Sequence, residues 1–391
     1  MIKAYIGPNG YGKTTKLNET IKMLKNSGIS EADILFLESE ILLSDEVKDS
    51  KDETKTMEYI LSELLETPNI ITLKSQLQTE INNTIGANQA NVNSIIDSIL
   101  NINGQTRTKN FISPNSKGLK YKQVVTIDNK EFLDKTGSGQ RMQLLLSLVK
   151  NSNKKYIFLD EPEKYSHPSL LNVTAKLIMD LSKLGKDIYI ATHSPKLLSM
   201  LNLELQNIYV INDSTHYCKN IDISGTISEL KTILPVANFT NKYSNYYETI
   251  TCSEIIKTIH YKDFLECLFS NRVYLCEGVN DKLFLFKYLQ DNGEFFDDYV
   301  IMSTFGKYPM PLFLNLFKKL GINVSCVFDE DDETKNYHKI TNDYISSNAS
   351  SFYKFNTTIE SELGYTDDKN DSMKFYDYIS GKTFLKTTYK I

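Results

Sequence analysis

The sequence lacks the features of a disulfide framework, a zinc-binding domain and a membrane anchor. Its five cysteines include no C-x-x-C pair, which argues against a zinc site and against structural disulfide bonds. No apolar run approaches the roughly 20 residues that a membrane span requires. The first residues run straight into a predicted strand, so we expect no signal peptide and a cytoplasmic protein with no membrane partner. With a net charge of −5, any contact with nucleic acid would need a local basic surface.

A glycine-rich loop at residues 7–15 fits the phosphate-binding pattern G-x-x-x-x-G-K-S/T at every fixed position. A predicted strand at residues 3–6 precedes the loop and a predicted helix at residues 14–25 follows it, which is the order that this motif requires. In such a loop the backbone N–H groups surround a β-phosphate, Lys13 reaches the β/γ oxygens and Thr14 ligates Mg²⁺. The predicted nucleotide-binding residues are Asn9, Gly10, Gly12, Lys13, Thr14 and Thr15.

A helical insertion is expected next. Residues 34–37 predict a second strand, and apolar residues then recur at helical spacing within residues 43–103. Residues 109–132 alternate more and predict short strands around a turn at residues 128–129. The insertion is too short for the long coiled-coil arms of some chromosome-maintenance ATPases.

The motif TGSGQR at residues 136–141 precedes a predicted helix at residues 142–149. It is similar to the signature loop of ABC-type ATPases, although Gly137 stands where that loop commonly has serine. A glycine-bearing turn at a helix N-terminus can form the second half of a phosphate clamp. The resemblance implies that nucleotide held by a second subunit contacts Ser138, Gly139 and Gln140. The Q-loop glutamine of this family could be either Gln76 or Gln78.

Residues 155–163 form an apolar strand that ends in acids, which is the Walker B arrangement. Asp160 is placed to bind Mg²⁺, directly or through water, and Glu161 is placed to orient the attacking water. Another apolar strand at residues 187–192 follows a predicted helix. His193, at its end, matches the switch histidine of ABC ATPases, which contacts the γ-phosphate.

The last part of the chain places acids at the ends of two further predicted strands. Glu277 follows the strand at residues 272–276, with Asp281 at the start of the next helix, and the strand at residues 322–328 ends in Asp329 and Asp331. Carboxylates at the ends of neighbouring strands hold Mg²⁺ or Mn²⁺ for phosphodiester chemistry. The adjoining Asp332 and Glu333 are interpreted as a solvated loop.

This block, residues 271–365, resembles the Toprim domain of topoisomerases, primases and OLD nucleases. The resemblance rests on Glu277-Gly278, Asp281 and the Asp329-x-Asp331 pair. A later glutamate, Glu360 or Glu362, resembles the further acid that OLD nucleases carry. The predicted metal ligands are Thr14, Asp160, Glu277, Asp281, Asp329, Asp331 and Glu360. The predicted catalytic residues are Glu161, His193, Glu277, Asp329 and Asp331.

An ABC-type ATPase followed by a Toprim domain is similar to the OLD (overcoming lysogenisation defect) family. We expect an α/β fold with an ABC-type P-loop ATPase domain at residues 1–212, which includes the insertion at about 43–103. A helical linker is expected at residues 213–270, with a polar, irregular stretch at 238–247 and a helix at 254–269. A Toprim-like parallel-sheet domain is expected at residues 271–391.

The resemblance implies an ATP-regulated endonuclease that depends on Mg²⁺ or Mn²⁺ and acts in anti-phage defence. Its implied partners are nucleic acid, with DNA favoured over RNA, and further copies of the chain in a dimer or higher even-numbered oligomer. A second defence protein is also an allowed partner. Two alternatives stay open: an ATP-driven sensor or scaffold whose Toprim half is not catalytic, and the ATP subunit of a transporter, which the Toprim-like block disfavours.

Overall fold

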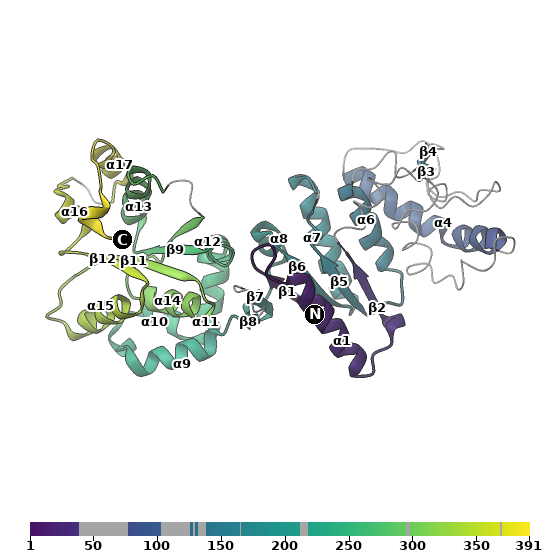
Figure 1. Ribbon diagram of the computed structural model, residues 1–391, viewed down its shortest axis with the longest axis horizontal. Helices are drawn as coiled ribbons and strands as arrows, with labels where there is room; N and C mark the ends of the chain where they lie inside the picture. The colour runs from purple at the N-terminus through teal and green to yellow at the C-terminus, as the bar shows by residue number, and fades with distance from the viewer. Residues whose placement is uncertain are drawn as a thin grey trace. The chain divides into compact units, whose positions relative to one another are not determined.

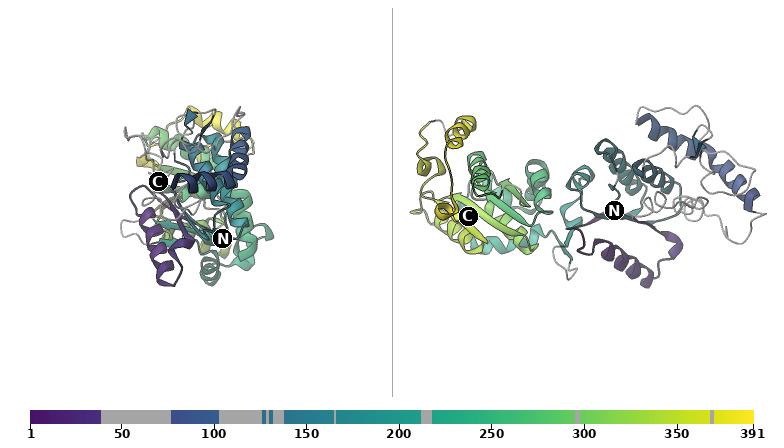
Figure 2. Two further views of the ribbon diagram at one scale, coloured as in Figure 1. Left: turned by 90° about the vertical axis from the view of Figure 1, so that its right-hand side faces the viewer. Right: turned by 45° about the horizontal axis from the view of Figure 1, so that its top comes forward.

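The structure is a computed structural model (Figure 1; Figure 2). It describes residues 1–38, 77–102, 126–127, 130–131, 138–164, 166–211, 218–294, 298–367 and 370–391. The chain divides into two compact units. The first comprises Met1–Tyr5 and Lys13–Leu201, and the second comprises Ile6–Gly12 and Asn202–Ile391. Parallel strands connected by helices make this an α/β protein, as the sequence predicts. The predicted domain boundaries at residues 212 and 270 stay a prediction.

A six-stranded sheet has the strand order β2-β5-β6-β1-β7-β8. Strands β2, β5 and β6 pair in parallel, and β7 pairs with β8 antiparallel. Ile157, Phe158 and Leu159 of β5 are fully buried, as expected for a parallel strand that is covered on both faces. The strands are β1 (Ile2–Ile6), β2 (Ile34–Leu37), β5 (Tyr156–Asp160), β6 (Asp187–Thr192), β7 (Ile208–Ile211) and β8 (Cys218–Asn220).

The helices of the first unit begin where the local sequence provides a cap. His167 accepts a hydrogen bond from the Ser169 backbone N–H, and Pro168 takes the first position of α7. The helix predicted to begin at residue 142 begins at Ser138 instead. The helices are α1 (Lys13–Asn26), α4 (Leu77–Ile102), α6 (Ser138–Val149), α7 (Pro168–Lys183) and α8 (Pro195–Leu201).

Only part of the predicted insertion lies within the described residues. Of residues 43–103, the stretch Leu77–Ile102 forms α4, which packs against α6. The predicted strands at residues 109–132 correspond to the antiparallel pair β3 (Thr126–Ile127) and β4 (Lys130–Glu131). The predicted turn at residues 128–129, with Gln76, Thr136 and Gly137, lies outside the described residues.

The second unit contains a four-stranded, entirely parallel sheet with the order β10-β9-β11-β12. Because all four strands are parallel, their carboxyl ends meet at one edge of the sheet. The strands are β9 (Arg272–Cys276), β10 (Tyr299–Ser303), β11 (Asn323–Asp329) and β12 (Ser351–Phe355). The connecting helices are α13 (Val279–Asp291), α14 (Met310–Lys319) and α15 (Asn336–Asn348). The parallel sheet is confirmed, whereas α15 and β12 were not predicted.

Helices precede and follow this sheet in the chain. The stretch at residues 238–247, expected to be irregular, forms short helical turns because Tyr246 and Tyr247 are buried and fix it to the core. The helix expected at residues 254–269 contains a π-helical segment, Ile256–His260. These helices are α9 (Ile223–Ile233), α10 (Asn241–Ser244), α11 (Thr249–Ile255), α12 (Tyr261–Cys267), α16 (Ile359–Leu363), α17 (Ser372–Ser380) and α18 (Lys386–Tyr389).

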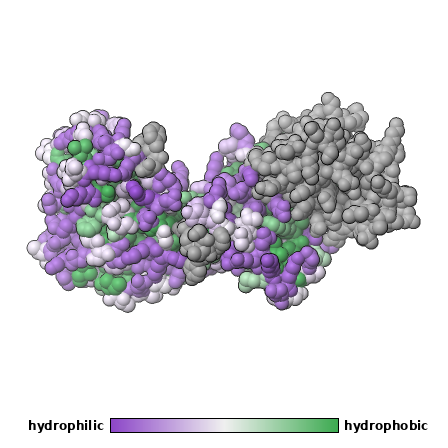
Figure 3. Space-filling view, viewed as in Figure 1, coloured by the Kyte–Doolittle hydropathy of each residue, from purple (hydrophilic) through white to green (hydrophobic). Residues whose placement is uncertain are grey.

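Hydrophilic residues predominate on the described surface in the view of Figure 3, and hydrophobic ones lie in scattered patches. None of the described helices is both long and apolar enough to cross a membrane.

The buried His260 predicts a specific pH dependence of stability. Its Nε2 lies 2.9 Å from the Tyr246 hydroxyl, its ring packs against Phe305 and Phe313, and burial lowers its pKa to about 4. In the unfolded chain the pKa returns to about 6.5, so unfolding takes up a proton between pH 6.5 and pH 4. The free energy of unfolding should therefore fall across this window, by at most about 3 kcal/mol from this residue.

We expect His260→Gln to lose that contribution, because glutamine does not titrate. Urea unfolding of the wild type and the variant from pH 7 to pH 4 measures it. The difference in unfolding free energy between them should shift in favour of the variant as the pH falls. Parallel curves would show that His260 is not kept neutral by its surroundings.

Candidate functional sites

The glycine-rich loop adopts a conformation that requires glycine. Gly7, Gly10 and Gly12 have φ values of 151°, 84° and 90°, which side-chain-bearing residues rarely adopt. A Cβ on Gly7 would lie 2.2 Å from the carbonyl oxygen of Ile211. The loop leads directly into α1, whose first residue is Lys13. It therefore presents backbone N–H groups at a helix N-terminus, where anions bind.

Lys13, Thr14 and Asp160 bring an ammonium, a hydroxyl and a carboxylate to one place. The Thr14 hydroxyl lies 3.1 and 3.0 Å from the two carboxylate oxygens of Asp160. Burial lowers the pKa of Lys13, opposed by the negative charges of Glu161 and Asp160, and burial raises the pKa of Asp160. A hydroxyl and a carboxylate in contact are oxygen ligands of the type that Mg²⁺ prefers. These residues therefore fit a magnesium nucleotide.

Glu161 and His193 contact each other at the ends of β5 and β6. His193 Nδ1 lies 3.2 Å from Glu161 Oε1 and 3.5 Å from Glu163 Oε1. Sequence reasoning missed Glu163, whose Oε1 accepts hydrogen bonds from the Thr192 hydroxyl at 2.5 Å and from the His193 N–H at 3.1 Å. The second acid of Glu161-Pro162-Glu163 was the available signal. Glu163 fixes the backbone that carries His193.

The other predicted nucleotide-binding residues lie in different surroundings. Asn9 and Thr15 are exposed, whereas Gly139 is buried in the first turn of α6. A Cβ on Gly139 would lie 3.2 Å from Cα of Ser166, so this position packs within its own unit. Ser138 and Gln140 belong to the same helical turn.

Four predicted metal ligands gather at the carboxyl edge of the parallel sheet in the second unit. Glu277 follows β9, Asp329 ends β11, Asp281 lies in the first turn of α13 and Glu360 lies in α16. The Asp329 backbone N–H donates to Glu277 Oε1 at 2.9 Å. The Asp329 carboxylate accepts from the Ile359 N–H at 3.0 Å, and Asp281 accepts from the Gly278 N–H at 2.9 Å. Three of these acids are thus held by backbone groups.

The four acids, hereafter the carboxylate cluster, repel one another. Burial, then Asp281 and Asp329, raise the pKa of Glu277 well above its usual value. Burial and Asp329 raise the pKa of Asp281 to about 8, and burial raises that of Asp329 to about 7, with Glu360 adding to it. Asp281 Oδ1 is buried and has no hydrogen-bond partner. Oxygen-only ligands with an orphaned buried oxygen fit a divalent cation.

The side chains of the carboxylate cluster are not arranged around a common metal position in this conformation. Among the residues that the structure describes, no three His, Cys, Asp or Glu side chains are arranged so that they could hold a metal ion together. Of the two later glutamates, Glu360 joins the cluster through Asn280, whose amide donates to its carboxylate at 2.8 Å. Glu362 instead accepts from the Tyr353 hydroxyl at 2.5 Å.

Asp331, the fifth predicted acid of this block, contacts Lys307 and His338 instead. Its Oδ2 lies 2.6 Å from Lys307 Nζ and 3.4 Å from His338 Nδ1. Sequence reasoning gave neither partner a role, and the only signal for Lys307 was its position in a Gly-Lys turn after β10. Asp332 is exposed and bonds to Thr334, and Glu333 pairs with Lys354.

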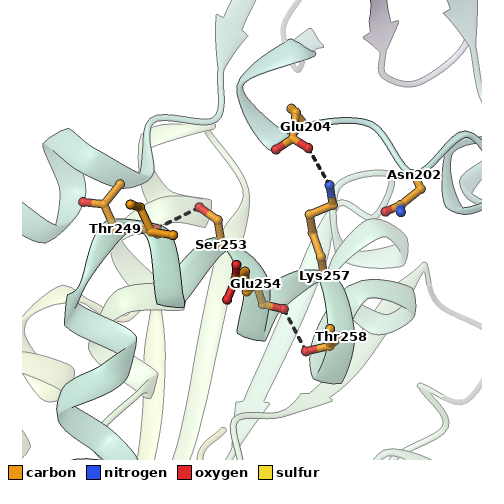
Figure 4. A pocket seen from close by; sticks show the side chains of 8 residues that line it. Asn202, Glu204, Thr249, Ser253, Glu254, Lys257 and Thr258 are labelled. Carbon is orange, nitrogen blue, oxygen red and sulfur yellow. Dashed lines mark hydrogen bonds and ion pairs between the residues drawn. The ribbon is translucent and has the colours of Figure 1, made fainter.

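An open groove of about 610 Å³ lies elsewhere on the second unit. It is lined by residues of the α11 and π-helical region, with Asn202 and Glu204 (Figure 4). Figure 4 shows Lys257 paired with Glu204, at 2.9 Å, and Glu254 lies beside them. Because its ammonium is already neutralised by a carboxylate, the groove is poorly suited to phosphate.

Two parts of the chain match models of protein families. Residues 43–198 match the AAA ATPase domain, a range that includes Asp160, Glu161 and His193 but begins after the glycine-rich loop. Residues 268–331 match the Toprim domain of overcoming lysogenization defect-like proteins. That range includes Glu277, Asp281, Asp329 and Asp331 but ends before Glu360.

Among curated proteins, the chain is similar to the Old nuclease of Escherichia phage P2, with 26% identity over 214 residues. The match covers 51% of this chain and 33% of that protein, so the chain spans about a third of its relative's length. Similar solved structures include a dimeric bacterial ABC transporter cassette, at 12% identity and a TM-score of 0.33 over 57% of this chain and 85% of that one. Another is the ATP-binding subunit of an ABC transporter, at 11% identity and a TM-score of 0.32 over 59% and 82%.

The repulsion within the carboxylate cluster predicts that Asp281→Asn stabilises the metal-free protein. The amide oxygen of asparagine can still accept the hydrogen bond from the Gly278 N–H. Folding of the variant no longer carries the cost of burying a carboxylate beside other acids, or of protonating that carboxylate. In EDTA at pH 7.5, we expect the thermal midpoint to rise by roughly 2–4 °C, the shift for about 1 kcal/mol in a domain of this size. The exposed Asp332→Asn should change little. A lower midpoint for Asp281→Asn than for wild type would refute the repulsion.

Proposed function

Because the chain is an OLD-like protein, which joins an AAA ATPase domain to an OLD-like Toprim domain, we propose that it is an ATP-hydrolysing, metal-dependent endonuclease of nucleic acid. The observation that carries the proposal is the carboxylate cluster at the edge of the parallel sheet, with its orphaned oxygen on Asp281. Buried acids that repel one another cost stability, and that cost is offset when a divalent cation binds.

In the Toprim half, Glu277, Asp281, Asp329 and Glu360 would hold the ion, Mg²⁺ or Mn²⁺. A divalent ion in this place supplies the positive charge that stabilises the attacking and leaving oxygens of a phosphodiester. The backbone hydrogen bonds to Glu277, Asp281 and Asp329 keep these carboxylates in position. That prior positioning lowers the cost of reorganising the site.

In the ATPase half, the AAA ATPase domain implies ATP hydrolysis. Lys13 would bind the β/γ-phosphates of ATP, and Thr14 and Asp160 would hold Mg²⁺. Glu161 would orient the attacking water, with His193 beside it. By its resemblance to an ABC signature loop, the α6 N-terminus would meet the nucleotide of a second copy, so we also propose a homodimer or higher even-numbered oligomer.

The proposed substrate is DNA, which is favoured over RNA. The proposed role is anti-phage defence, and a second defence protein is an allowed partner. Both follow from the resemblance to the OLD family, and the relative's name, Old nuclease, supports the nuclease class. The alternative is an ATP-driven sensor or scaffold with a non-catalytic Toprim domain. It draws support from one observation: the described acids do not close around a common point.

The first functional prediction compares Lys13→Ala with Glu161→Gln. Removing the Lys13 ammonium should abolish ATP binding, whereas Glu161→Gln should retain binding and lower the ATPase rate by about 100-fold or more. Fluorescent-nucleotide binding and phosphate release measure the two effects.

The Glu161→Gln variant also reports on assembly, because bound ATP persists in it. Light scattering with ATP should show a dimer or higher even-numbered oligomer for this variant and less assembly for Lys13→Ala. ATP turnover at the wild-type rate by both variants would remove the ATPase assignment. A monomer at every protein concentration would refute the proposal that two copies share a nucleotide site.

The second functional prediction separates the two halves. Asp329→Ala should reduce cleavage of plasmid DNA by about 100-fold or more, because it removes a metal ligand, and should leave ATP hydrolysis nearly unchanged. Asp332→Ala, on the same loop but exposed, is the matched control and should cut like wild type. The assay uses plasmid, linear DNA and tRNA with Mg²⁺ or Mn²⁺, with and without ATP. Equal cleavage by wild type and Asp329→Ala would favour the sensor alternative.

A further inference from the structure

Lys307 is a lysine enclosed within the acidic edge of the sheet. Its side chain is 1% exposed, although lysine is almost never fully buried unless it is paired. It follows β10 directly after Gly306, whose φ is 130°. Its ammonium lies 2.6 Å from Asp331 Oδ2 and donates to the carbonyl oxygens of Asp329, at 2.8 Å, and Glu330, at 3.3 Å.

These three contacts use all three protons of the ammonium. Asp331 is the only carboxylate among the three acceptors, so it is the counter-ion of Lys307. Asp331 also has a φ of 57°, a left-handed conformation that non-glycine residues adopt at a cost. The lysine thus fixes the whole turn from Asp329 to Asp331 through two carbonyl groups and one carboxylate.

Asp331 cannot be both the counter-ion of Lys307 and a ligand of a divalent ion without a large energetic penalty. If the carboxylate bound an ion instead, the buried ammonium would be left without its counter-ion, which is strongly unfavourable. If the carboxylate bridged both, the ion and the ammonium would lie a few Å apart and repel each other strongly. The Nδ1 atom of His338 lies 3.4 Å from the same oxygen.

The carboxylate cluster differs in its partners. Within the described part of the chain, Glu277, Asp281, Asp329 and Glu360 form no ion pair with Lys, Arg or His. They accept hydrogen bonds from backbone N–H groups and from the Asn280 amide. The Asp329-x-Asp331 pair is therefore divided, with one acid in the cluster and the other on the lysine.

We propose that Asp331 is the fixed counter-ion of Lys307 and does not ligate metal, so that the carboxylate cluster takes one divalent ion per chain. Lys307 then supplies the positive charge that a second ion would otherwise bring to this edge. Asp331 and Lys307 are positioning residues that hold Asp329. The inference rests on the proposed function only in treating the same cluster as a cation site.

The number of ions bound per chain is measured by titrating the nucleotide-free protein with Mn²⁺. Calorimetry detects binding, and electron paramagnetic resonance detects the free Mn²⁺. Asp160→Asn is the background, so that the ATPase half adds no ion. We expect one Mn²⁺ per chain, a change of less than about three-fold in affinity for Asp331→Asn, and a loss of about 10- to 100-fold or more for Asp329→Asn. Thermal unfolding in EDTA confirms that each variant is folded.

Lys307→Met gives the sharper test. It frees Asp331, so a second Mn²⁺ should bind per chain, and the double variant Lys307→Met/Asp331→Asn should return to one. Two ions in the Asp160→Asn background, or equal loss of affinity for Asp331→Asn and Asp329→Asn, would overturn the inference and leave a metal-dependent nuclease intact. One ion with the expected pattern, but no cleavage of any nucleic acid, would support the inference and remove the nuclease.

Discussion

The acidic edge of the four-stranded parallel sheet is governed by an imbalance of charge among buried and half-buried side chains. Four carboxylates, Glu277, Asp281, Asp329 and Glu360, lie together, and the buried ammonium of Lys307 is held by a fifth acid, Asp331. Burial and mutual repulsion raise the pKa values of Glu277, Asp281 and Asp329. Such a group is unfavourable alone and favourable around a cation, which is why perturbed acids mark functional sites.

Both halves use the same feature of parallel sheets to gather these groups. Asp160 ends β5 and His193 follows β6 in one sheet, and Glu277 follows β9 and Asp329 ends β11 in the other. Parallel strands bring residues that are distant in sequence to one edge, and the following helix N-termini face that edge. The backbone thus places the charged groups, and the apolar strands anchor them.

The sequence predicted this arrangement wherever a strand, a charged residue and a helix follow in order. Lys13, Thr14, Asp160, Glu277, Asp281 and Asp329 all belong to such segments. It did not predict Glu163, Lys307 or His338, because their roles arise from contacts between segments that local patterns do not encode. It also missed β12 and α15, where tyrosine, serine and asparagine obscure the periodicity of a half-buried element.

Whether the carboxylate cluster is a cation site can be measured most directly by crystallography. Crystals grown with Mn²⁺ and measured at the manganese absorption edge give an anomalous difference map. We expect a peak at the carboxyl edge of the parallel sheet, roughly 2.0–2.3 Å from oxygens of Asp281 and Asp329, with Asp331 still bound to Lys307. A map with no peak at these carboxylates, in crystals where the Thr14 and Asp160 site holds manganese, would contradict it.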